Sequence, residues 1–293
     1  MTDMDIDAAI LERARAGAEL AEAELLALDG ADVLSLGMLA DEVRRARVGD
    51  RVGFVRVFDV GPETVTTEGG LAVPAAAQEV RLSAAADTFQ QTIDLIRRVR
   101  AGIGKGPRLT GFSLGAIAAR EWGDLPAVLT AFKSSGLDAL AEAPVDLVSP
   151  AEVGTAIASG VTPQMLSVQR WPGEGRIPVL LRARAIATAN PAITRFAPLS
   201  REQSVTAPTT GYHDVRMVAL ARLALPALPT IDVDWQQYGP KLAQVALMFG
   251  ANHLDRVSAV DDPTLGSRRA SAEEVRRNIV AAGFTPGDPG AAA

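Results

Sequence analysis

The stretch TIDVDWQQYGPKLAQVALMF, residues 230–249, contains one complete unit of the predicted fold. Thr230–Asp234 alternates apolar and acidic side chains, which is the pattern of a strand with one buried face. Gly239 and Pro240 then mark a turn, and the proline suits the first turn of a helix over Lys241–Phe249. This stretch therefore predicts a strand followed by a helix.

The same alternation recurs along most of the chain. Six further apolar runs, separated by stretches with helical patterning, are Val52–Val60, Glu79–Leu82, Arg108–Ser113, Leu137–Leu140, Val161–Val168 and Thr194–Pro198. Alternating strands and helices favour parallel βα units. Because no glycine-rich turn follows the first strand, seven such units predict a full or partial TIM-type barrel rather than a doubly wound sheet.

The segment before the first strand reads as helical. Ala8–Leu28 is rich in Ala, Glu and Leu, and a second helix is expected to be capped by Asp32 and to stop at Gly49. We interpret the arginines at its end, Arg44, Arg45 and Arg47, as a solvated helix terminus favoured by the helix dipole. One structural domain is predicted, with accessory helices at 1–50, a barrel at 51–285 and a disordered tail at 286–293.

Composition sets limits on the partners of this chain. Its 293 residues are 48% hydrophobic, enough for a large core, and the net charge of -6 gives no reason to bind nucleic acid. No stretch approaches the roughly 20 apolar residues that a membrane helix needs. The start, Met1–Asp7, is acidic where a signal peptide is basic. We expect no membrane association and a cytoplasmic location.

The chain contains no cysteine and two histidines. Thiolate nucleophiles, disulfides and cysteine-held metal centres are therefore excluded as intrinsic features. His213 lies at an expected helix start and His253 in the expected turn GANHLD, so both are predicted to be exposed rather than catalytic.

Functional groups of such a barrel lie at the C-terminal ends of its strands. This rule nominates, among others, Asp59, Ser83, Ser200 and Arg201. The catalytic candidates are the carboxylates Asp232, Asp234, Asp146 and Glu142. The candidates for substrate binding are Gln169, Arg170, Ser113, Arg195 and Gln236.

Two of these groups have a specific chemical rationale. Asp232 and Asp234 flank Val233, so both can face the barrel interior and share a proton or hold a cation; the alternative is that they pair with arginines such as Arg195 or cap the next helix. Gln169 and Arg170 can recognise carboxylate or nucleobase edges by hydrogen bonds, or serve only as solvated surface.

Three segments carry a family resemblance: ADVLSLGMLADEVRRARVGDRVGFV (Ala31–Val55), RFAPLS (Arg195–Ser200) and above all DWQQYGPKLAQVALMFGANHLD (Asp234–Asp255). They resemble the radical SAM enzymes of futalosine-dependent menaquinone synthesis, aminofutalosine synthase and dehypoxanthine futalosine cyclase, and the related deazaflavin (FO) synthase subunit. The similarity runs from about Ala31 to Pro286. It implies a radical-SAM-like TIM-type barrel, in full or in part.

The chain departs from that family at three points of one cofactor site. The resemblance implies a CxxxCxxC loop for a [4Fe–4S] cluster after the first strand, yet Phe54–Gly70 has no cysteine. A Gly-Gly pair near SAM is replaced within Ser83–Ala86, and in Leu140–Ser149 the side chains of Glu142, Ala143 and Pro144 fill a glycine-rich turn. We therefore predict that the cluster and SAM are both lost and that no metal or other cofactor is bound.

Two classes of function remain open. The first is a pseudoenzyme of menaquinone or deazaflavin biosynthesis that acts as a partner or regulator of a radical SAM paralogue or another enzyme of that pathway, or that binds a nucleoside-like intermediate. The second is a non-radical enzyme that uses the carboxylates at the barrel mouth for acid–base chemistry on a nucleoside-like or carboxylate substrate. An enzyme predicts a deep polar pocket, whereas a partner protein predicts a filled mouth.

Overall fold

Eight parallel strands close into a barrel in the computed structural model of the chain, which describes residues 6–65, 71–104, 106–171, 175–202, 209–261 and 271–287. The barrel strands are β1 (Arg51–Val60), β2 (Glu79–Leu82), β3 (Arg108–Ser113), β4 (Ala139–Pro144), β5 (Leu166–Arg170), β6 (Arg195–Glu202), β7 (Thr230–Asp234) and β8 (His253–Ser258). Each pairs with the next in chain order, and β8 pairs with β1 to close the ring. The predicted TIM-type barrel is confirmed, in its full form.

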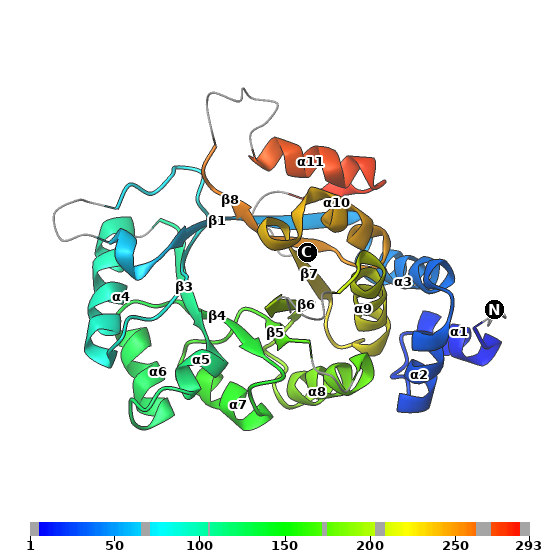
Figure 1. Ribbon diagram of the computed structural model, residues 1–293, viewed down its shortest axis with the longest axis horizontal. Helices are drawn as coiled ribbons and strands as arrows, with labels where there is room; N and C mark the ends of the chain where they lie inside the picture. The colour runs from blue at the N-terminus through cyan, green and yellow to red at the C-terminus, as the bar shows by residue number, and fades with distance from the viewer. Residues whose placement is uncertain are drawn as a thin grey trace.

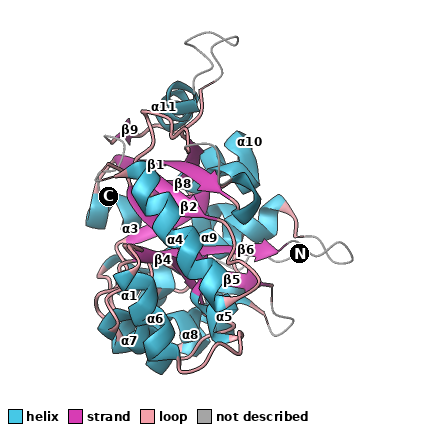
Figure 2. Cartoon of the chain, turned by 90° about the vertical axis from the view of Figure 1, so that its left-hand side faces the viewer, coloured by secondary structure: helices cyan, strands magenta, loops and turns pink. Residues whose placement is uncertain are grey.

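Helices surround this ring, as Figure 1 shows. They are α4 (Phe89–Ile103), α5 (Leu114–Ala118), α6 (Leu125–Ser134), α7 (Pro150–Ala158), α8 (Arg176–Ala189), α9 (Gly211–Ala224), α10 (Trp235–Met248) and α11 (Ser271–Ala281), with a short 3-10 turn, η1 (Pro62–Thr64), after β1. The view in Figure 2, turned by 90°, shows α4 and α6 on the outside of the strands. None of the helices in the described ranges has the length and apolar character to cross a bilayer.

The strand prediction needs correction at β8. We expected His253 in an exposed turn, but His253–Ser258 is the eighth barrel strand and His253 is buried. Predicted turns also lie within strands: β4 extends to Pro144, and β6 extends through Ser200 and Arg201. The short β9 (Thr285–Pro286) pairs with the start of β1, although we assigned Pro286 to the disordered tail; residues 288–293 lie outside the described part.

The N-terminal segment contains three helices rather than two: α1 (Ala8–Arg15), α2 (Glu22–Gly30) and α3 (Val33–Val48). The Asp32 cap of α3 is confirmed by a 2.8 Å hydrogen bond from the Ser35 N–H to its carboxylate. Our interpretation of Arg44 was wrong, because its side chain is fully buried and donates to the carbonyl of Ala251.

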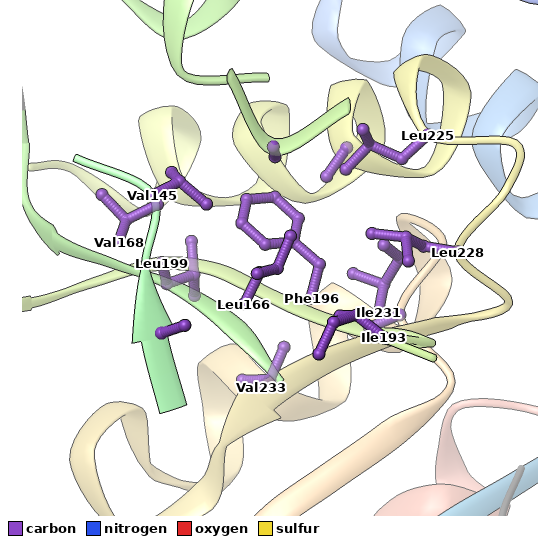
Figure 3. Packing of buried hydrophobic residues seen from close by; sticks show 14 of the residues in the cluster. Val145, Leu166, Val168, Ile193, Phe196, Leu199, Leu225, Leu228, Ile231 and Val233 are labelled. Carbon is purple, nitrogen blue, oxygen red and sulfur yellow. The ribbon is translucent and has the colours of Figure 1, made fainter. Parts of the chain in front are cut away.

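The hydrophobic core lies between the strands and their covering helices. Figure 3 shows Leu166 of β5 and Phe196 of β6 packed close together, with Ile231 of β7 nearby. Ile231 and Val233 alternate with Asp232 and Asp234, so the apolar side chains of β7 face the helices and its carboxylates face the barrel interior. The barrel interior is therefore the place to look for a site.

Candidate functional site

Asp232 is held by an ion pair deep inside the barrel. Its two oxygens accept hydrogen bonds from Arg195 Nη2 at 2.6 Å and Nε at 3.0 Å, and Nδ1 of His253 lies 2.6 Å from the first of these oxygens. Burial alone would raise the pKa of Asp232, but the charges of Arg195 and His253 lower it to about 2. Asp232 is thus a fixed anion and not a proton donor at neutral pH.

A second buried cluster joins β2 to β8. Arg81 donates to both oxygens of Asp255, at 2.8 and 2.9 Å, and to Glu79 at 2.6 Å. Burial opposes the charge on Asp255, yet the Arg81 guanidinium holds the pKa of that carboxyl well below its usual range. Thr110 also donates to Glu79, so the cluster is tied to β3 as well.

Asp234 connects the barrel interior to its mouth. Its carboxylate accepts hydrogen bonds from Arg201 and Arg256, both at 3.2 Å, and from the N–H of Gln237 at 2.9 Å, which caps α10. Burial raises the pKa of Asp234 above its ordinary value, although both arginines oppose this shift. These contacts agree with the alternative of arginine pairing and helix capping, and a catalytic role of Asp232 or Asp234 stays a prediction.

A pocket of about 600 Å³ opens at the C-terminal ends of the strands. Its lining includes apolar side chains from β2, β3, β4 and α5, and polar or charged side chains from β1, β2, β3, β4, β5, β6 and β8. The lining residues are Asp59, Arg81, Leu82, Ser83, Ala84, Ala85, Phe112, Ser113, Gly115, Ala116, Ile117, Ala119, Arg120, Ala141, Glu142, Leu147, Gln169, Arg170, Arg201, Glu202, Gln237 and Arg256. We call this the mouth pocket.

The mouth pocket brings together part of the predicted set. Of the catalytic and substrate-binding candidates, its lining includes Ser113, Glu142, Gln169 and Arg170; of the wider set, it includes Asp59, Ser83 and Arg201. The lining excludes Asp232, Asp234, Arg195, Asp146 and Gln236. Ligand binding by the first group stays a prediction.

Several candidates outside the mouth pocket have visible structural roles. Asp146 accepts the backbone N–H groups of Gln169 and Arg170 at 2.8 and 2.9 Å, so it fixes the end of β5. Gln236 is exposed, and its neighbour Gln237 lines the pocket instead. The side-chain amide of Gln237 donates hydrogen bonds to the carbonyls of Ser200 and Arg201.

Sequence reasoning missed important lining residues. Arg256 was missed together with β8, and Arg120 lies just past α5, outside the strand ends that we searched. Arg81 had a usable signal, since Glu79 and Arg81 alternate with apolar Val80 and Leu82 in β2. A charged face on a strand closed into a barrel indicates a polar interior.

Backbone strain is concentrated at the mouth pocket. Among the described residues, Phe112 (φ 63°) and Arg256 (φ 55°) are the non-glycine residues with left-handed backbone conformations, and both line the pocket. Beside them, Ser113 Oγ and Arg256 Nε are buried without a hydrogen-bond partner. A strained backbone conformation and an unpaired buried polar atom both raise the free energy of the folded protein. They persist only where the surrounding structure enforces them, and they cluster at functional sites.

The residues after β1 do not fit a cysteine-ligated iron–sulfur cluster. The chain supplies no thiolate, and Asp59 at the end of β1 is paired with Arg256 at 3.1 Å. Within the described ranges, no group of three His, Asp or Glu side chains is arranged to hold a metal ion. Residues 66–70 of the predicted loop lie outside the described part.

Comparison with known proteins identifies relatives of the C-terminal part. Residues 193–288 match the CofH/MqnC C-terminal region. This CofH/MqnC match begins just before β6, ends after β9, and contains the segment Asp234–Asp255 that carried the resemblance. This part of the chain is therefore similar to the C-terminal region of CofH-like proteins.

Curated relatives agree with the CofH/MqnC match. A 5-amino-6-(D-ribitylamino)uracil–L-tyrosine 4-hydroxyphenyl transferase of Methanopyrus kandleri is 27% identical over 82% of this chain and 71% of its own length. The protein of the same name from Methanosphaerula palustris is 39% identical over 27% of this chain, and the aligned part spans only 24% of that relative.

Solved structures share the barrel fold of this chain. Methylornithine synthase (PylB) superposes with a TM-score of 0.67 at 15% identity, covering 95% of this chain and 97% of that one. HydG, the FeFe-hydrogenase maturase from Carboxydothermus hydrogenoformans, also gives 0.67, at 13% identity over 95% of this chain and 78% of its own. These two likenesses concern the barrel alone.

Proposed function

We propose that this chain is a CofH-like pseudoenzyme that binds a small molecule of menaquinone or deazaflavin biosynthesis at its mouth pocket, without cluster or SAM. It holds an intermediate for, or regulates, a radical SAM paralogue or another enzyme of the pathway. The CofH/MqnC match and the absence of any cysteine support this proposal.

The open mouth pocket is the observation that carries the binding role. We expected a filled mouth for a partner protein, whereas a pocket of about 600 Å³ is within the size range of small-molecule sites. The pocket therefore favours a role in binding an intermediate over a role as a partner alone. The strain at Phe112 and Arg256 gives further support, because both residues line that pocket.

Two observations favour the alternative, a non-radical acid–base enzyme. The open mouth pocket with its partly polar lining is what an enzyme predicts. Asp234 is buried with a raised pKa, which is a property of many catalytic carboxylates. Against it, the Asp234 carboxylate already accepts hydrogen bonds from Arg201, Arg256 and Gln237 and does not line the pocket. We therefore favour binding over catalysis.

A bulky substitution in the mouth pocket tests the binding role. Ala116→Trp places an indole on the exposed pocket side of α5, and Ala127→Trp places the same group on an exposed position of α6, away from the mouth. The full chain, isolated from its native host, is expected to carry a co-purifying small molecule that mass spectrometry detects. Ala116→Trp should reduce it at least tenfold, while Ala127→Trp should retain it. Equal retention in both variants, or no molecule in the parent, contradicts the proposal.

Loss of the cluster has its own test. Anaerobic reconstitution with iron and sulfide is expected to leave the purified chain without stoichiometric [4Fe–4S] absorption, because no thiolate is present. A stable, stoichiometric cluster signal would show that the cluster part of the proposal is wrong.

A further inference from the structure

Arg120 is a cation of the mouth pocket that lacks an anionic partner. Its Nη1 makes one long hydrogen bond, 3.4 Å, to the carbonyl of Asp87, and its guanidinium lies 5.1 Å from the centre of the Trp122 ring. Within the part of the chain that the structure describes, no carboxylate forms an ion pair with Arg120.

The other outer guanidinium groups of the pocket are already neutralised. Arg201 pairs with Glu142 at 2.7 Å, Arg256 pairs with Asp59 at 3.1 Å, and Arg170 pairs with Glu202. Arg120 therefore differs from its neighbours, because its positive charge is available to whatever enters the pocket.

A chain of aromatic contacts fixes Arg120 at the edge of the pocket. Trp122 packs on Phe132 with ring centres 6.5 Å apart, and Phe132 packs on Phe112 at 5.4 Å. Phe112 itself lines the pocket. A cation on an aromatic face is attracted to it but keeps its outward N–H groups available, so the position of Arg120 is restricted while its charge is not consumed.

The wall beside Arg120 is made of small apolar residues. Ala84 and Ala85 follow β2, and Ala116 and Ala119 belong to α5 and its end. Leu147 closes this side, and its side chain is 52% exposed although it is large and apolar. Because this wall and Arg120 line the same pocket, a ligand can rest an apolar group on the small side chains and present an anionic group to the guanidinium.

We infer that the ligand of the mouth pocket carries an anionic group, a carboxylate or a phosphate, which Arg120 binds, on a compact apolar body that rests on the alanine wall. This inference rests on the proposed binding function, since it concerns the same pocket. Arginine is suited to both anions because its planar fork matches their oxygens.

Binding of three simple probes to the purified full chain tests this assignment. Benzoate and phenyl phosphate carry the two anions on one apolar ring, and benzamide is the neutral match of benzoate. Calorimetric titration is expected to show that at least one anion binds at least tenfold more tightly than benzamide. The tighter of the two anions identifies carboxylate or phosphate as the natural group.

Variants of Arg120 then locate the anion. Arg120→Gln should weaken the preferred anion at least tenfold, whereas Arg120→Lys should keep a preference for the anion over benzamide. Arg98→Gln is the matched control, because Arg98 is also exposed and also bonds a backbone carbonyl, that of Asp94, outside the mouth pocket. It should bind the anions as the parent does, and melting curves should verify that all variants fold.

The outcomes separate this inference from the proposed function. Equal binding of benzoate, phenyl phosphate and benzamide, no binding of any probe, or equal affinities in Arg120→Gln and Arg98→Gln overturns the anion assignment alone. Loss of the co-purifying molecule in Ala116→Trp would still support the binding role of the pocket.

Discussion

At the scale of single residues, the molecule buries charges in pairs and at helix ends. Asp232, Asp234 and Asp255 are each bound by arginine inside the barrel. Arg222 is also buried, but it donates to the carbonyls of Gly250 and Pro229 and to the side chain of Asn252. Burial, together with repulsion from neighbouring arginines, lowers the pKa of Arg222 to about 9, so carbonyl acceptors offset only part of the cost.

Asp232→Asn tests the strength of the deepest pair. Leaving Arg195 without its partner in the barrel interior should lower the free energy of unfolding by about 3 kcal/mol in urea at pH 7. Asp94→Asn is the control, since the Asp94 side chain is half exposed and lies 3.9 Å from Arg97, and it should change stability by less than about 0.5 kcal/mol. Equal effects of the two substitutions would contradict a structural role of Asp232.

The effect of Asp232→Asn on the free energy of unfolding should depend on pH. Because the folded pKa of Asp232 is about 2, below its ordinary value of 3.8, its contribution is present above pH 3.8 and is lost as pH falls toward 2. The stability difference between parent and Asp232→Asn should therefore shrink by about 2 kcal/mol between pH 5 and pH 2. A difference independent of pH in urea titrations would contradict this.

At the scale of elements, α3 and α10 meet at a position without a side chain. A Cβ on Gly37 would lie 2.5 Å from Cε1 of Phe249. Glycine within a helix costs about 1 kcal/mol relative to alanine, so its presence in α3 is explained by this close approach to the phenyl ring. Gly37 thus allows the last accessory helix to pack on the barrel.

Gly37→Ala is expected to destabilise the protein by about 1–3 kcal/mol, because overpacking outweighs the better helix propensity. Gly102→Ala in α4 is the matched control, since a Cβ there meets only Leu71 at 3.5 Å, an ordinary contact. The control should be stabilised by up to about 1 kcal/mol. Thermal and urea unfolding measure the stability of both variants. An increase in the stability of Gly37→Ala would contradict the prediction, because it would show that the Phe249 ring moves aside at little cost.

The strands also show which sequence patterns were sufficient to predict the secondary structure. β1, β2, β3 and β7 were predicted closely because their apolar residues form continuous or alternating runs. β8 was missed because its inward positions, His253 and Asp255, are polar and made the strand resemble a turn. Pairing partners inside a closed barrel make such a strand stable, and no local pattern contains that information.

At the scale of the whole molecule, the accessory helices are bound to the barrel. Arg216 of α9 donates to the carbonyls of Asp29 and Ala31, both at 2.7 Å, and Arg184 of α8 donates to the carbonyl of Leu20 at 2.9 Å. Leu25 and Leu28 of α2 are fully buried. We therefore expect the helices and the barrel to unfold together.

Two adjacent leucines of α2 test this cooperativity. Leu25 is 0% exposed and Leu26 is 55% exposed. Leu25→Ala should lower the stability of the whole chain by about 2–5 kcal/mol, whereas Leu26→Ala should change it by less than about 0.5 kcal/mol. Circular dichroism and tryptophan fluorescence should report one coincident transition in both variants. An early, separate transition in Leu25→Ala would mean that the helices unfold independently.

The candidate site was predictable to the extent that topology determines it. Placing functional groups at strand ends found Ser113, Glu142, Gln169 and Arg170, because that rule depends only on parallel βα order. It could not find Arg120, whose surroundings depend on the contact of Trp122, in the loop between α5 and α6, with Phe132 of α6. Nor could it show that Asp234 would be bound by two arginines from different strands.

β9 joins the end of the described chain to the N-terminal end of β1, where Val52 pairs with Pro286. The carbonyl of Val52 accepts a hydrogen bond from the N–H of Gly287 at 2.8 Å. Asp59 lines the pocket seven residues further along that strand. At about 3.3 Å per residue, roughly 20 Å of strand separates Gly287 from the pocket. A biotin or fluorophore held at Gly287 itself would therefore lie at the opposite end of the barrel from the ligand entrance, and protein immobilised at that point should report the same affinities as protein free in solution.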